Sequence, residues 1–353
     1  MTQNNYLVIM AGGIGSRFWP VSTAQKPKQF LDMLGTGRTL FQHTVDRFKA
    51  ICPPENMLVV TSANYSALVK EQCSELLDGN ILAEPCMRNT APCIAYACYK
   101  IKKTNPQANI VVSPADHLID SFALFQDTIA KGLEFTARNQ AILTLGISPQ
   151  RPETGYGYIQ TSNKSAEIAQ VKAFKEKPQL DIARQYLADG GYYWNAGIFI
   201  FRVETMIKAF EQYQPTLAES FKEGDNFFNT PQETSFINQV YPSCENISID
   251  YAVMEKAQNL YVQKASFSWS DLGTWSALWD KVQKTGQGNH ANSTYSAFYE
   301  SSNTLVHLST IKNVIIQGLN DYVVVEANGT LMICSKQEEQ RIKQFLQDIE
   351  KTV

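Results

Sequence analysis

Histidine is scarce in this chain, and its cysteines show no pairing pattern. There are four histidines in 353 residues, and the seven cysteines are odd in number and form no Cys-x-x-Cys motif. His117 adjoins an aspartate but has no second histidine at ligand spacing, so we interpret it as a structural or supporting residue. We therefore expect reduced thiols in a cytoplasmic protein, without a disulfide framework or a zinc site.

Long apolar runs and an excess of basic charge are also missing. The 31 lysines and arginines are outnumbered by 34 aspartates and glutamates, which gives a net charge of -3. This balance argues against a broad basic surface, so we expect neither nucleic acid nor an anionic membrane as a partner. The apolar run from Tyr6 breaks at Gly12, short of the ~20 residues of a membrane span, and we expect no signal peptide.

Strand and helix patterns alternate through the first third of the chain. Helical spacing of apolar residues, as in Leu40–Phe48 and Phe122–Ala137, separates short apolar runs. We expect these runs to be strands, at Tyr6–Met10, Met57–Val60, Ile81–Ala83, Asn109–Val112 and Ala141–Leu145. Alternation of this kind predicts an α/β fold with a parallel sheet that is covered by helices on both faces.

The pattern changes beyond residue 154. Strands of mixed direction are expected at Gly155–Gln160, Val171–Lys175 and Tyr192–Phe201. Helices are expected at Val203–Tyr213 and Pro215–Phe221. A polar connection then leads to a further helix that we expect around Ile249–Ala257.

A polar stretch over residues 283–292 contains Gly286 and Gly288 and predicts a domain boundary. We therefore divide the chain into a domain over residues 1–285 and a short domain over residues 286–353. The second domain is expected to hold a small stacked β unit, from the runs Thr304–Leu308, Asn313–Ile316, Tyr322–Glu326 and Thr330–Ile333. An amphipathic helix at Lys336–Lys351 is expected to close the chain.

The end of the first predicted strand is a glycine-rich turn. Gly12, Gly13 and Gly15 are followed by the cations Arg17 and Lys28. Glycines let a backbone turn its N–H groups toward a ligand at close range, and Arg and Lys match the charge of phosphate. The sequence therefore predicts a polyphosphate site at the carboxyl end of the first strand. A tight turn without a ligand is the alternative.

Two aspartates are candidates for a magnesium site. Asp116 follows the predicted strand Asn109–Val112, and Asp271 lies between Trp269 and Gly273. Mg²⁺ takes a few carboxylates together with substrate phosphates and water. For either aspartate alone, a turn or helix-capping role explains the residue equally well.

A third group of polar residues suits a sugar phosphate. Glu176 and Lys177 end a predicted strand, where a carboxylate can accept sugar hydroxyls and an ammonium can hold a phosphate. Asn195 lies within an apolar strand, and a buried amide needs hydrogen-bond partners that sugar hydroxyls would supply. A solvated strand end and a core asparagine bonded to the backbone are the alternatives.

Together these segments resemble the sugar-1-phosphate nucleotidyltransferases, and within them the branch that uses mannose 1-phosphate and GTP. The resemblance covers about residues 6–280 and continues more loosely to the end. It rests on motifs that follow one another in the family's order: Ala11-Gly-Gly-x-Gly-x-Arg17-x-Trp-Pro20, Pro27-Lys28-Gln-Phe30, Glu84-Pro, Arg88-Asn89-Thr90-Ala-Pro92, Ser113-Pro-Ala-Asp116-His117, Glu153-Thr-Gly155-Tyr156-Gly-Tyr-Ile159, Phe174-Lys-Glu176-Lys177-Pro178, Trp194-Asn195-Ala-Gly197, Ser248-Ile-Asp250-Tyr and Trp269-Ser-Asp271-Leu-Gly273-Thr-Trp275.

The resemblance implies a Rossmann-like (GT-A-like) nucleotidyltransferase fold, a mixed sheet with helices on both faces, and a short C-terminal unit like a left-handed β-helix. It implies transfer of GMP from GTP to α-D-mannose 1-phosphate, with Mg²⁺ as cofactor and GDP-mannose and pyrophosphate as products. Arg17, Lys28 and Asp116 would be catalytic, and Asp116 and Asp271 would hold the metal. The nucleotide would contact Ala11, Gly12, Gly13, Gly15, Arg17, Lys28, Glu84, Asn89, Thr90 and Asp116. The sugar phosphate would contact Gly155, Tyr156, Glu176, Lys177, Asn195 and Asp250.

The family also implies a homodimer. Some members carry an isomerase domain of the cupin type, which we do not expect here.

Other functions are compatible with parts of this pattern. Another hexose 1-phosphate or another nucleotide would suit the same motifs. A catalytically silent sugar-nucleotide sensor would be expected to lack Lys28, Asp116 or Asp271, and all three are present. A nicotinamide-dependent dehydrogenase would rest on Gly13-x-Gly15 alone, because Phe18 takes the place of the third glycine.

Overall fold

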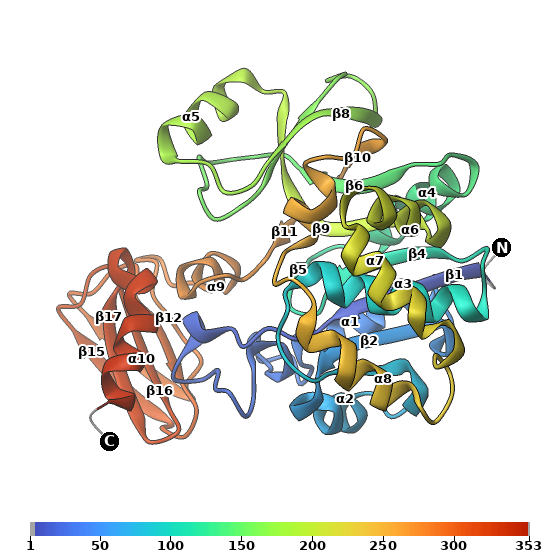
Figure 1. Cartoon of the computed structure of the whole chain (residues 1–353). Helices are drawn as coiled ribbons and strands as arrows, with labels where there is room; N and C mark the ends of the chain where they lie inside the picture. The colour runs from blue at the N-terminus through green and yellow to red at the C-terminus, as the bar shows by residue number, and fades with distance from the viewer. Residues whose placement is uncertain (1–3, 352–353) are drawn as a thin grey trace. The chain divides into compact units, whose positions relative to one another are not determined.

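The computed structural model of the chain describes residues 4–351 and divides into two compact units (Figure 1). Among the described residues, the first unit comprises 4–12, Thr44–Ala115 and Ile119–Trp269. The second unit comprises Gly13–His43, Asp116–Leu118 and 270–351. The domain division at residues 285 and 286 stays a prediction. None of the helices within residues 4–351 combines the length and the apolar character that crossing a bilayer would require.

The first unit is built on one mixed sheet, which has nine strands among the described residues. Their order across the sheet is β3-β2-β1-β4-β9-β6-β10-β8-β7. The bounds are β1 (Asn5–Met10), β2 (Met57–Ser62), β3 (Ile81–Glu84), β4 (Asn109–Pro114), β6 (Ile142–Ile147), β7 (Tyr158–Thr161), β8 (Ile168–Lys175), β9 (Tyr192–Arg202) and β10 (Leu260–Lys264).

Strand direction brings several strand ends to one edge of this sheet. Strands β1, β2, β3 and β4 run parallel to one another. Strand β9 lies antiparallel between β4 and β6, so β6 runs in the direction of β4, and β10 is parallel to β6. The carboxyl ends of β1, β3 and β4 therefore share the edge where α/β sheets bind ligands.

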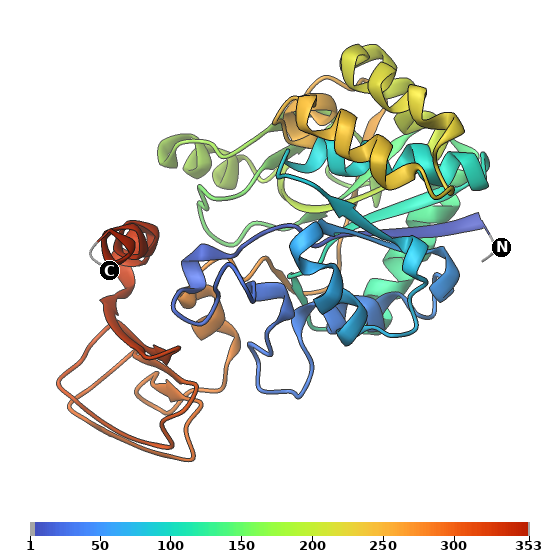
Figure 2. The ribbon, with the colours of Figure 1, turned by 60° about the horizontal axis from the view of Figure 1, so that its bottom comes forward.

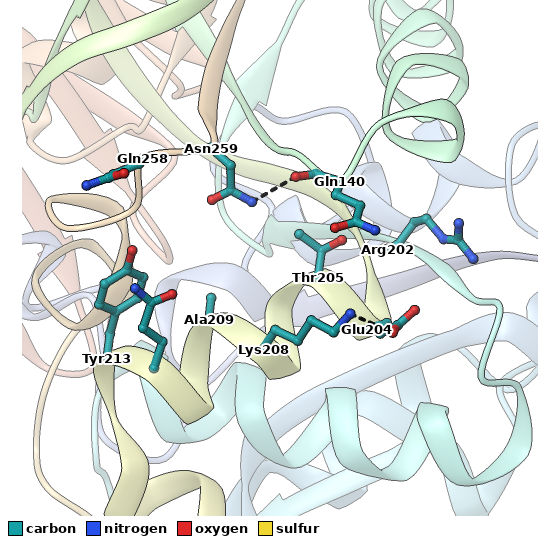
Figure 3. Close-up of a pocket in the computed structure, with 10 residues that line it drawn as sticks. Gln140, Arg202, Glu204, Thr205, Lys208, Ala209, Tyr213, Gln258 and Asn259 are labelled. Carbon is teal, nitrogen blue, oxygen red and sulfur yellow. Dashed lines mark hydrogen bonds and ion pairs between the residues drawn. The ribbon is translucent and has the colours of Figure 1, made fainter.

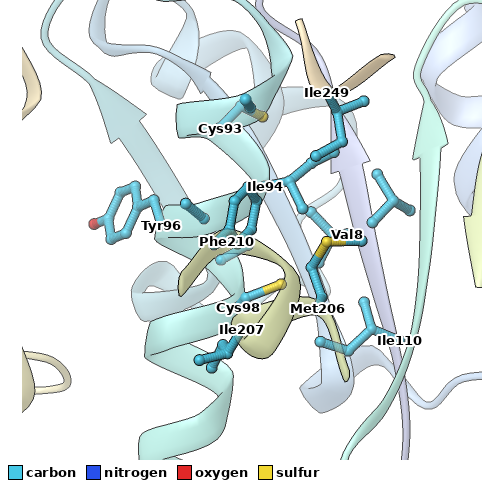
Figure 4. Packing of buried hydrophobic residues seen from close by; sticks show 14 of the residues in the cluster. Val8, Cys93, Ile94, Tyr96, Cys98, Ile110, Met206, Ile207, Phe210 and Ile249 are labelled. Carbon is cyan, nitrogen blue, oxygen red and sulfur yellow. The ribbon is translucent and has the colours of Figure 1, made fainter. Parts of the chain in front are cut away.

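Helices cover both faces of the sheet because its central strands are apolar on both sides. On one face, α3 (Thr90–Thr104), α6 (Val203–Tyr213) and α7 (Pro215–Lys222) form a core with alternate residues of the strands. Figure 4 shows Val8 and Ile110 of the sheet packed against Ile94, Met206 and Phe210 of these helices.

The opposite face of the sheet is buried as well. Leu7 and Ile9 alternate with Val8 along β1, so they lie on the face of the sheet opposite to Val8, and both are fully buried. Helix α4 (Phe122–Arg138) contacts β4, β6 and β9 and buries Ile129. Shorter helices of the chain are α1 (Leu40–Phe48), α2 (Ser66–Gln72), α5 (Leu180–Asp189) and α8 (Glu233–Val240).

The second unit stacks short strands in parallel columns. Strands β12, β14 and β16 are parallel neighbours, β13 and β15 form a second parallel pair, and β17 adds antiparallel to β16. Figure 2 shows the resulting coils nearly end-on. The left-handed turn of the coils stays a prediction. The bounds are β12 (His290–Ala291), β13 (Tyr295–Tyr299), β14 (Leu305–Leu308), β15 (Asn313–Gln317), β16 (Tyr322–Ala327), β17 (Thr330–Ser335), α9 (Trp275–Lys281) and α10 (Ile342–Glu350), with two-residue strands β5 (Leu118–Ile119) and β11 (Trp269–Ser270) elsewhere.

Most expected elements are confirmed, and four expectations need correction. The expected helix around Ile249–Ala257 is a π-helix over Asp250–Met254, a wider turn that occurs often at functional sites. The strand expected from Gly155 begins only at Tyr158. The polar connection before residue 249 contains α8, and the closing helix begins with a 3₁₀ segment, Lys336–Arg341, ahead of α10. Tertiary contacts can override local propensity, and local periodicity does not record them.

Candidate functional site

The glycine turn in the second unit presents a row of backbone N–H groups. Residues 13–17 donate no backbone hydrogen bond to any acceptor within the described part of the chain. Two carbonyls of the turn accept hydrogen bonds from side chains. Gln29 Nε2 donates to Gly13 O at 2.8 Å, and Ser22 Oγ donates to Ile14 O at 2.7 Å. A succession of such N–H groups at a turn forms a concave site for anions.

Gly15 and Lys28 touch in a way that requires the glycine. Gly15 has φ +67°, which side chains other than glycine's rarely adopt. A Cβ at this position would lie 2.6 Å from the Cβ of Lys28. The turn can therefore approach the lysine only where residue 15 has no side chain.

Lys28 is buried and joins the two candidate metal aspartates. Its Nζ lies 2.6 Å from Asp116 Oδ2 and donates to the carbonyls of Asp271 and Leu272 at 3.0 Å each. A short 3₁₀ turn, Lys28–Phe30, fixes the lysine backbone. Burial alone would raise the pKa of Asp116, but the charges of Lys28 and His117 hold that pKa below its ordinary value. Asp116 is therefore ionised at neutral pH.

These residues line one pocket of about 240 Å³ within the second unit. It brings together the predicted residues Gly15, Arg17, Lys28, Asp116 and Asp271. Arg17 is exposed and forms no hydrogen bond or ion pair with any residue between 4 and 351. The other lining residues were not predicted as site residues: Ser16, Phe18, His117, Gly273 and Lys343. Of these, only Lys343 lies outside every sequence motif, in the charged closing helix.

The donor set of this pocket suits Mg²⁺. Asp116 and Asp271 offer carboxylates, and Asp271 Oδ1 is oriented by the N–H of Gly273 at 2.9 Å. Over residues 4–351 no group of three or more His, Cys, Asp and Glu side chains has the arrangement of a complete metal site. Two carboxylates fit a metal whose remaining ligands are substrate phosphates and water, as Mg²⁺ prefers.

A second pocket, of about 450 Å³, lies within the first unit. It brings together the predicted residues Asn89, Thr90, Glu176, Lys177 and Asp250, and it adds Asn246, Ile247, Ser248 and Tyr251, which sequence reasoning did not select. Asn89 caps helix α3, with its Oδ1 accepting from the N–H of Thr90 at 3.0 Å. Thr90 Oγ1 in turn accepts from Ile249 N at 2.8 Å, which ties the helix start to the π-helix segment.

Asp250 and Asn195 share a hydrogen bond at the edge of this pocket. Asn195 Nδ2 donates to Asp250 Oδ1 at 3.1 Å, while Asn195 Oδ1 accepts from Thr144 Oγ1 at 3.0 Å and from Gly197 N at 3.1 Å. The asparagine amide is thus held in one orientation. Burial and the nearby charge of Glu176 raise the pKa of Asp250 to about 7.

Glu176 and Lys177 form a tight ion pair at the end of β8. Lys177 Nζ lies 2.5 Å from Glu176 Oε1, and Lys177 adopts the left-handed backbone with φ 45°. Only about 9% of the Glu176 side chain is exposed, whereas the Lys177 side chain is 60% exposed. A Cβ on Gly157 would meet Glu176 Oε2 at 2.5 Å, so the carboxylate occupies the space above a glycine.

Gly155 and Tyr156 lie in an aromatic loop that neither pocket includes. The ring of Tyr156 packs edge-on against Trp194 and Trp269, with centroids 5.2 Å apart in both pairs. The N–H of Gly155 donates to Glu153 Oε1 at 3.0 Å. This loop therefore places the packed ring of Tyr156 and a hydrogen-bonded turn just before strand β7.

Ala11, Gly12 and Glu84 lie together at the ends of β1 and β3. Glu84 is buried and accepts a short hydrogen bond from the hydroxyl of Tyr241, and burial raises the pKa of Glu84 to about 7. A Cβ on Gly12 would lie 3.0 Å from Glu84 Oε2. The N–H of Ala11 donates to Val60 O at 2.8 Å, so it extends the sheet.

Figure 3 shows a third pocket, which none of the predicted residues lines. It has about 240 Å³ and lies at the amino ends of β6 and β10, beside α6. Its charged groups are already engaged, with Lys208 Nζ 2.8 Å from Glu204 and Arg202 bonded to Gln107. This pocket therefore differs from the other two, because its charged side chains are already paired and none of the predicted residues lines it.

Known proteins match this chain over nearly its whole length. A profile of the family described as nucleotidyl transferase matches residues 6–288. The chain is 35% identical to mannose-1-phosphate guanylyltransferase of Escherichia coli, over 98% of this chain and 74% of that protein. It is 36% identical to the alginate biosynthesis protein AlgA of Pseudomonas aeruginosa, over 97% of this chain and 72% of that protein.

A solved structure agrees with these relatives. A crystal structure described as mannose-1-phosphate geranyltransferase from Thermus thermophilus superposes with a TM-score of 0.88 at 27% identity, covering 99% of this chain and all of that one. The family profile, the relatives and the superposed structure therefore point to the same family. The chain belongs to the nucleotidyl transferase family.

Proposed function

We propose that this chain is a mannose-1-phosphate guanylyltransferase, which transfers GMP from GTP to mannose 1-phosphate and releases pyrophosphate. One observation carries the proposal: Arg17, Lys28, Asp116 and Asp271 line a single pocket beside a turn of unpaired backbone N–H groups. This is a site built for several phosphate charges at once. The names of the relatives supply the nucleotide and the sugar.

In the proposed reaction, a phosphate oxygen of mannose 1-phosphate attacks the α-phosphorus of GTP in line. The new bond joins that oxygen to the α-phosphorus, the bond to the β-phosphate oxygen breaks, and its electron pair leaves with pyrophosphate. The attacking phosphate is already ionised, so no general base is needed. Catalysis then consists mainly of positioning and charge neutralisation.

Lys28 is the proposed stabiliser of the charge that develops at the α-phosphate. Its burial and its carbonyl contacts hold the ammonium in one place, so little reorganisation is needed during the reaction. The N–H groups of Gly13 and Gly15 and the guanidinium of Arg17 would bind the departing phosphates. Ala11, Gly12, Glu84, Asn89 and Thr90 are proposed to contact the rest of the nucleotide.

We propose Mg²⁺ as the cofactor, held by Asp116 and Asp271. A bound Mg²⁺ would supply positive charge to the phosphates that meet in the reaction. The pairing of Lys28 with Asp116 keeps that carboxylate ionised, which a metal ligand must be.

The sugar phosphate is proposed to bind Gly155, Tyr156, Glu176, Lys177, Asn195 and Asp250. Glu176 and the oriented amide of Asn195 would bond to hydroxyls, and the exposed Lys177 would reach the phosphate. We also propose that the protein forms a homodimer, as its family implies, and works in the cytoplasm. The free thiols of its seven cysteines suit a reducing compartment.

Initial rates of pyrophosphate release test the choice of substrates. Purified protein is given each of GTP, ATP, UTP and dTTP with mannose, glucose or N-acetylglucosamine 1-phosphate and Mg²⁺. The proposal expects the highest kcat/KM with GTP and mannose 1-phosphate. A higher value for UTP with glucose 1-phosphate would contradict it.

A further inference from the structure

The C-terminal helix contributes a lysine to the phosphate pocket. Lys343, in the first turn of α10, lines the same cavity as Arg17, Lys28 and the two aspartates. This helix lies outside every motif that marks the family in this sequence. A segment outside the motifs therefore completes the pocket, and comparing the motifs alone would not find it.

Packing fixes the position of this helix within the second unit. Ile342, next to Lys343, is fully buried in a cluster with Phe18 and Trp275. Phe18 ends the 3₁₀ turn that begins at Ser16, so the start of α10 is anchored to the glycine turn itself. Figure 1 shows α10 lying along the strands of the C-terminal unit, and Met332 and Cys334 of β17 share the same cluster.

The ammonium of Lys343 has no partner among residues 4–351. It forms no ion pair or hydrogen bond there. Glu339, four residues earlier, turns instead to the backbone N–H of Ser276 at 2.9 Å. No contact within the described chain therefore engages this ammonium.

The pocket carries net positive charge, because Arg17, Lys28 and Lys343 outnumber the carboxylates of Asp116 and Asp271. Asp116 already pairs with Lys28, whereas Arg17 and Lys343 both lack a partner in the described chain. Two free cations at one cavity beside unpaired N–H groups attract a ligand with several negative charges. Pyrophosphate and the outer phosphates of a nucleoside triphosphate are such groups.

We propose that Lys343 binds the outer phosphates of the nucleoside triphosphate and, after transfer, the pyrophosphate. This inference rests on the proposed function for the identity of the triphosphate. It gives the C-terminal helix a direct part in substrate binding. Lys28 serves the reacting phosphate, while Arg17 and Lys343 hold the group that leaves.

Binding of magnesium pyrophosphate to the full-length chain tests the proposal without turnover. Calorimetry compares wild type with Lys343→Met, which keeps the aliphatic stem, and Lys343→Arg, which keeps the charge. Lys312→Met is the matched control, since Lys312 is an exposed lysine of the same unit that does not line this pocket. We expect Kd to rise about tenfold in Lys343→Met, as for a lost charge-assisted hydrogen bond, and to change less than about twofold in Lys343→Arg and Lys312→Met.

Kinetics separate this inference from the proposed function. In Lys343→Met, KM for GTP should rise while KM for mannose 1-phosphate stays unchanged, and the near-UV circular dichroism should match wild type. Pyrophosphate binding as tight in a folded Lys343→Met or Lys343→Gln as in wild type would overturn the inference. If wild type forms no GDP-mannose but Lys343→Met still weakens pyrophosphate binding, the proposed function fails and this inference stands.

Discussion

The ammonium of Lys28 lies 2.6 Å from the carboxylate of Asp116 and also donates to the backbone carbonyl of Asp271. One buried cation therefore connects the two aspartates that we assign to the metal, although 243 positions separate Lys28 from Asp271. Removing the lysine would leave Asp116 without its counter-charge and would free the loop that carries Asp271. The consequences of this arrangement can be measured residue by residue.

Lys28→Ala should lower kcat by more than ~100-fold, because it removes charge stabilisation at the reacting phosphate. Initial rates with saturating GTP and mannose 1-phosphate measure the effect. Lys26→Ala, at an exposed lysine two positions earlier, is the control and should keep nearly normal rates. A kcat for Lys28→Ala close to wild type would remove Lys28 from the catalytic role.

Asp271→Asn should also lower turnover by more than ~100-fold, since the amide is a poorer ligand for Mg²⁺ and carries no charge. Titration of activity with Mg²⁺ should show a raised metal requirement in the variant. Asp280→Asn, at an exposed aspartate of the same unit, serves as control. Wild-type activity that survives complete chelation of divalent metal would contradict the metal assignment.

Gly15→Ala should impair nucleotide binding beyond its cost in stability. The added Cβ would be strained by φ +67° and would lie 2.6 Å from the Cβ of Lys28. Gly35→Ala is a matched control, because Gly35 has φ +68° but a Cβ there would meet nothing within 4 Å. Gly35→Ala should lose about 1 kcal/mol of unfolding free energy from its φ alone. Gly15→Ala should lose more because of the clash with Lys28, and only Gly15→Ala should raise KM for GTP. Equal kinetics in the two variants would show that the contact with Lys28 is unimportant.

The first strand, its glycine turn and most elements of the first third could be predicted, because each depends on local apolar periodicity or on short motifs. The grouping of Arg17, Lys28, Asp116 and Asp271 also followed from the motifs. The position of β9 between β4 and β6 could not be predicted, since strand pairing depends on contacts across the chain. The place of Lys343 in the pocket could not be predicted for the same reason, because it depends on the packing of Ile342 in one cluster with Phe18.

The contribution of Glu84 to stability should fall as the pH rises from about 4.5 to about 7. Burial raises the pKa of Glu84 from 4.5 to about 7, so the folded state favours the neutral acid. This stabilisation is complete below the unfolded pKa and is lost as the pH rises through the folded pKa. The Glu84 contribution is on the order of 3 kcal/mol. Urea titrations from pH 4.5 to 8 measure it.

Glu84→Gln should make that pH dependence shallower. Asp250, whose pKa is raised to about 7 by burial and by Glu176, contributes with the same sign and remains in this variant. In the double variant with Asp250→Asn, stability should instead rise with pH from about 4.5 to about 6.5, because burial lowers the pKa of His307 to about 4 and that group acts with the opposite sign. An unchanged slope in Glu84→Gln would mean that Glu84 is already ionised in the folded protein at low pH.

The fate of ¹⁸O in the phosphate of labelled mannose 1-phosphate tests the central claim most directly. The protein is given GTP, Mg²⁺ and mannose 1-phosphate with ¹⁸O in its non-bridging phosphate oxygens, and the products are analysed by ³¹P NMR and mass spectrometry. Attack by the sugar phosphate on the α-phosphorus predicts GDP-mannose that retains all the label, including one ¹⁸O between the two phosphorus atoms, and unlabelled pyrophosphate. Label in the pyrophosphate, or no GDP-mannose at all, would contradict the account.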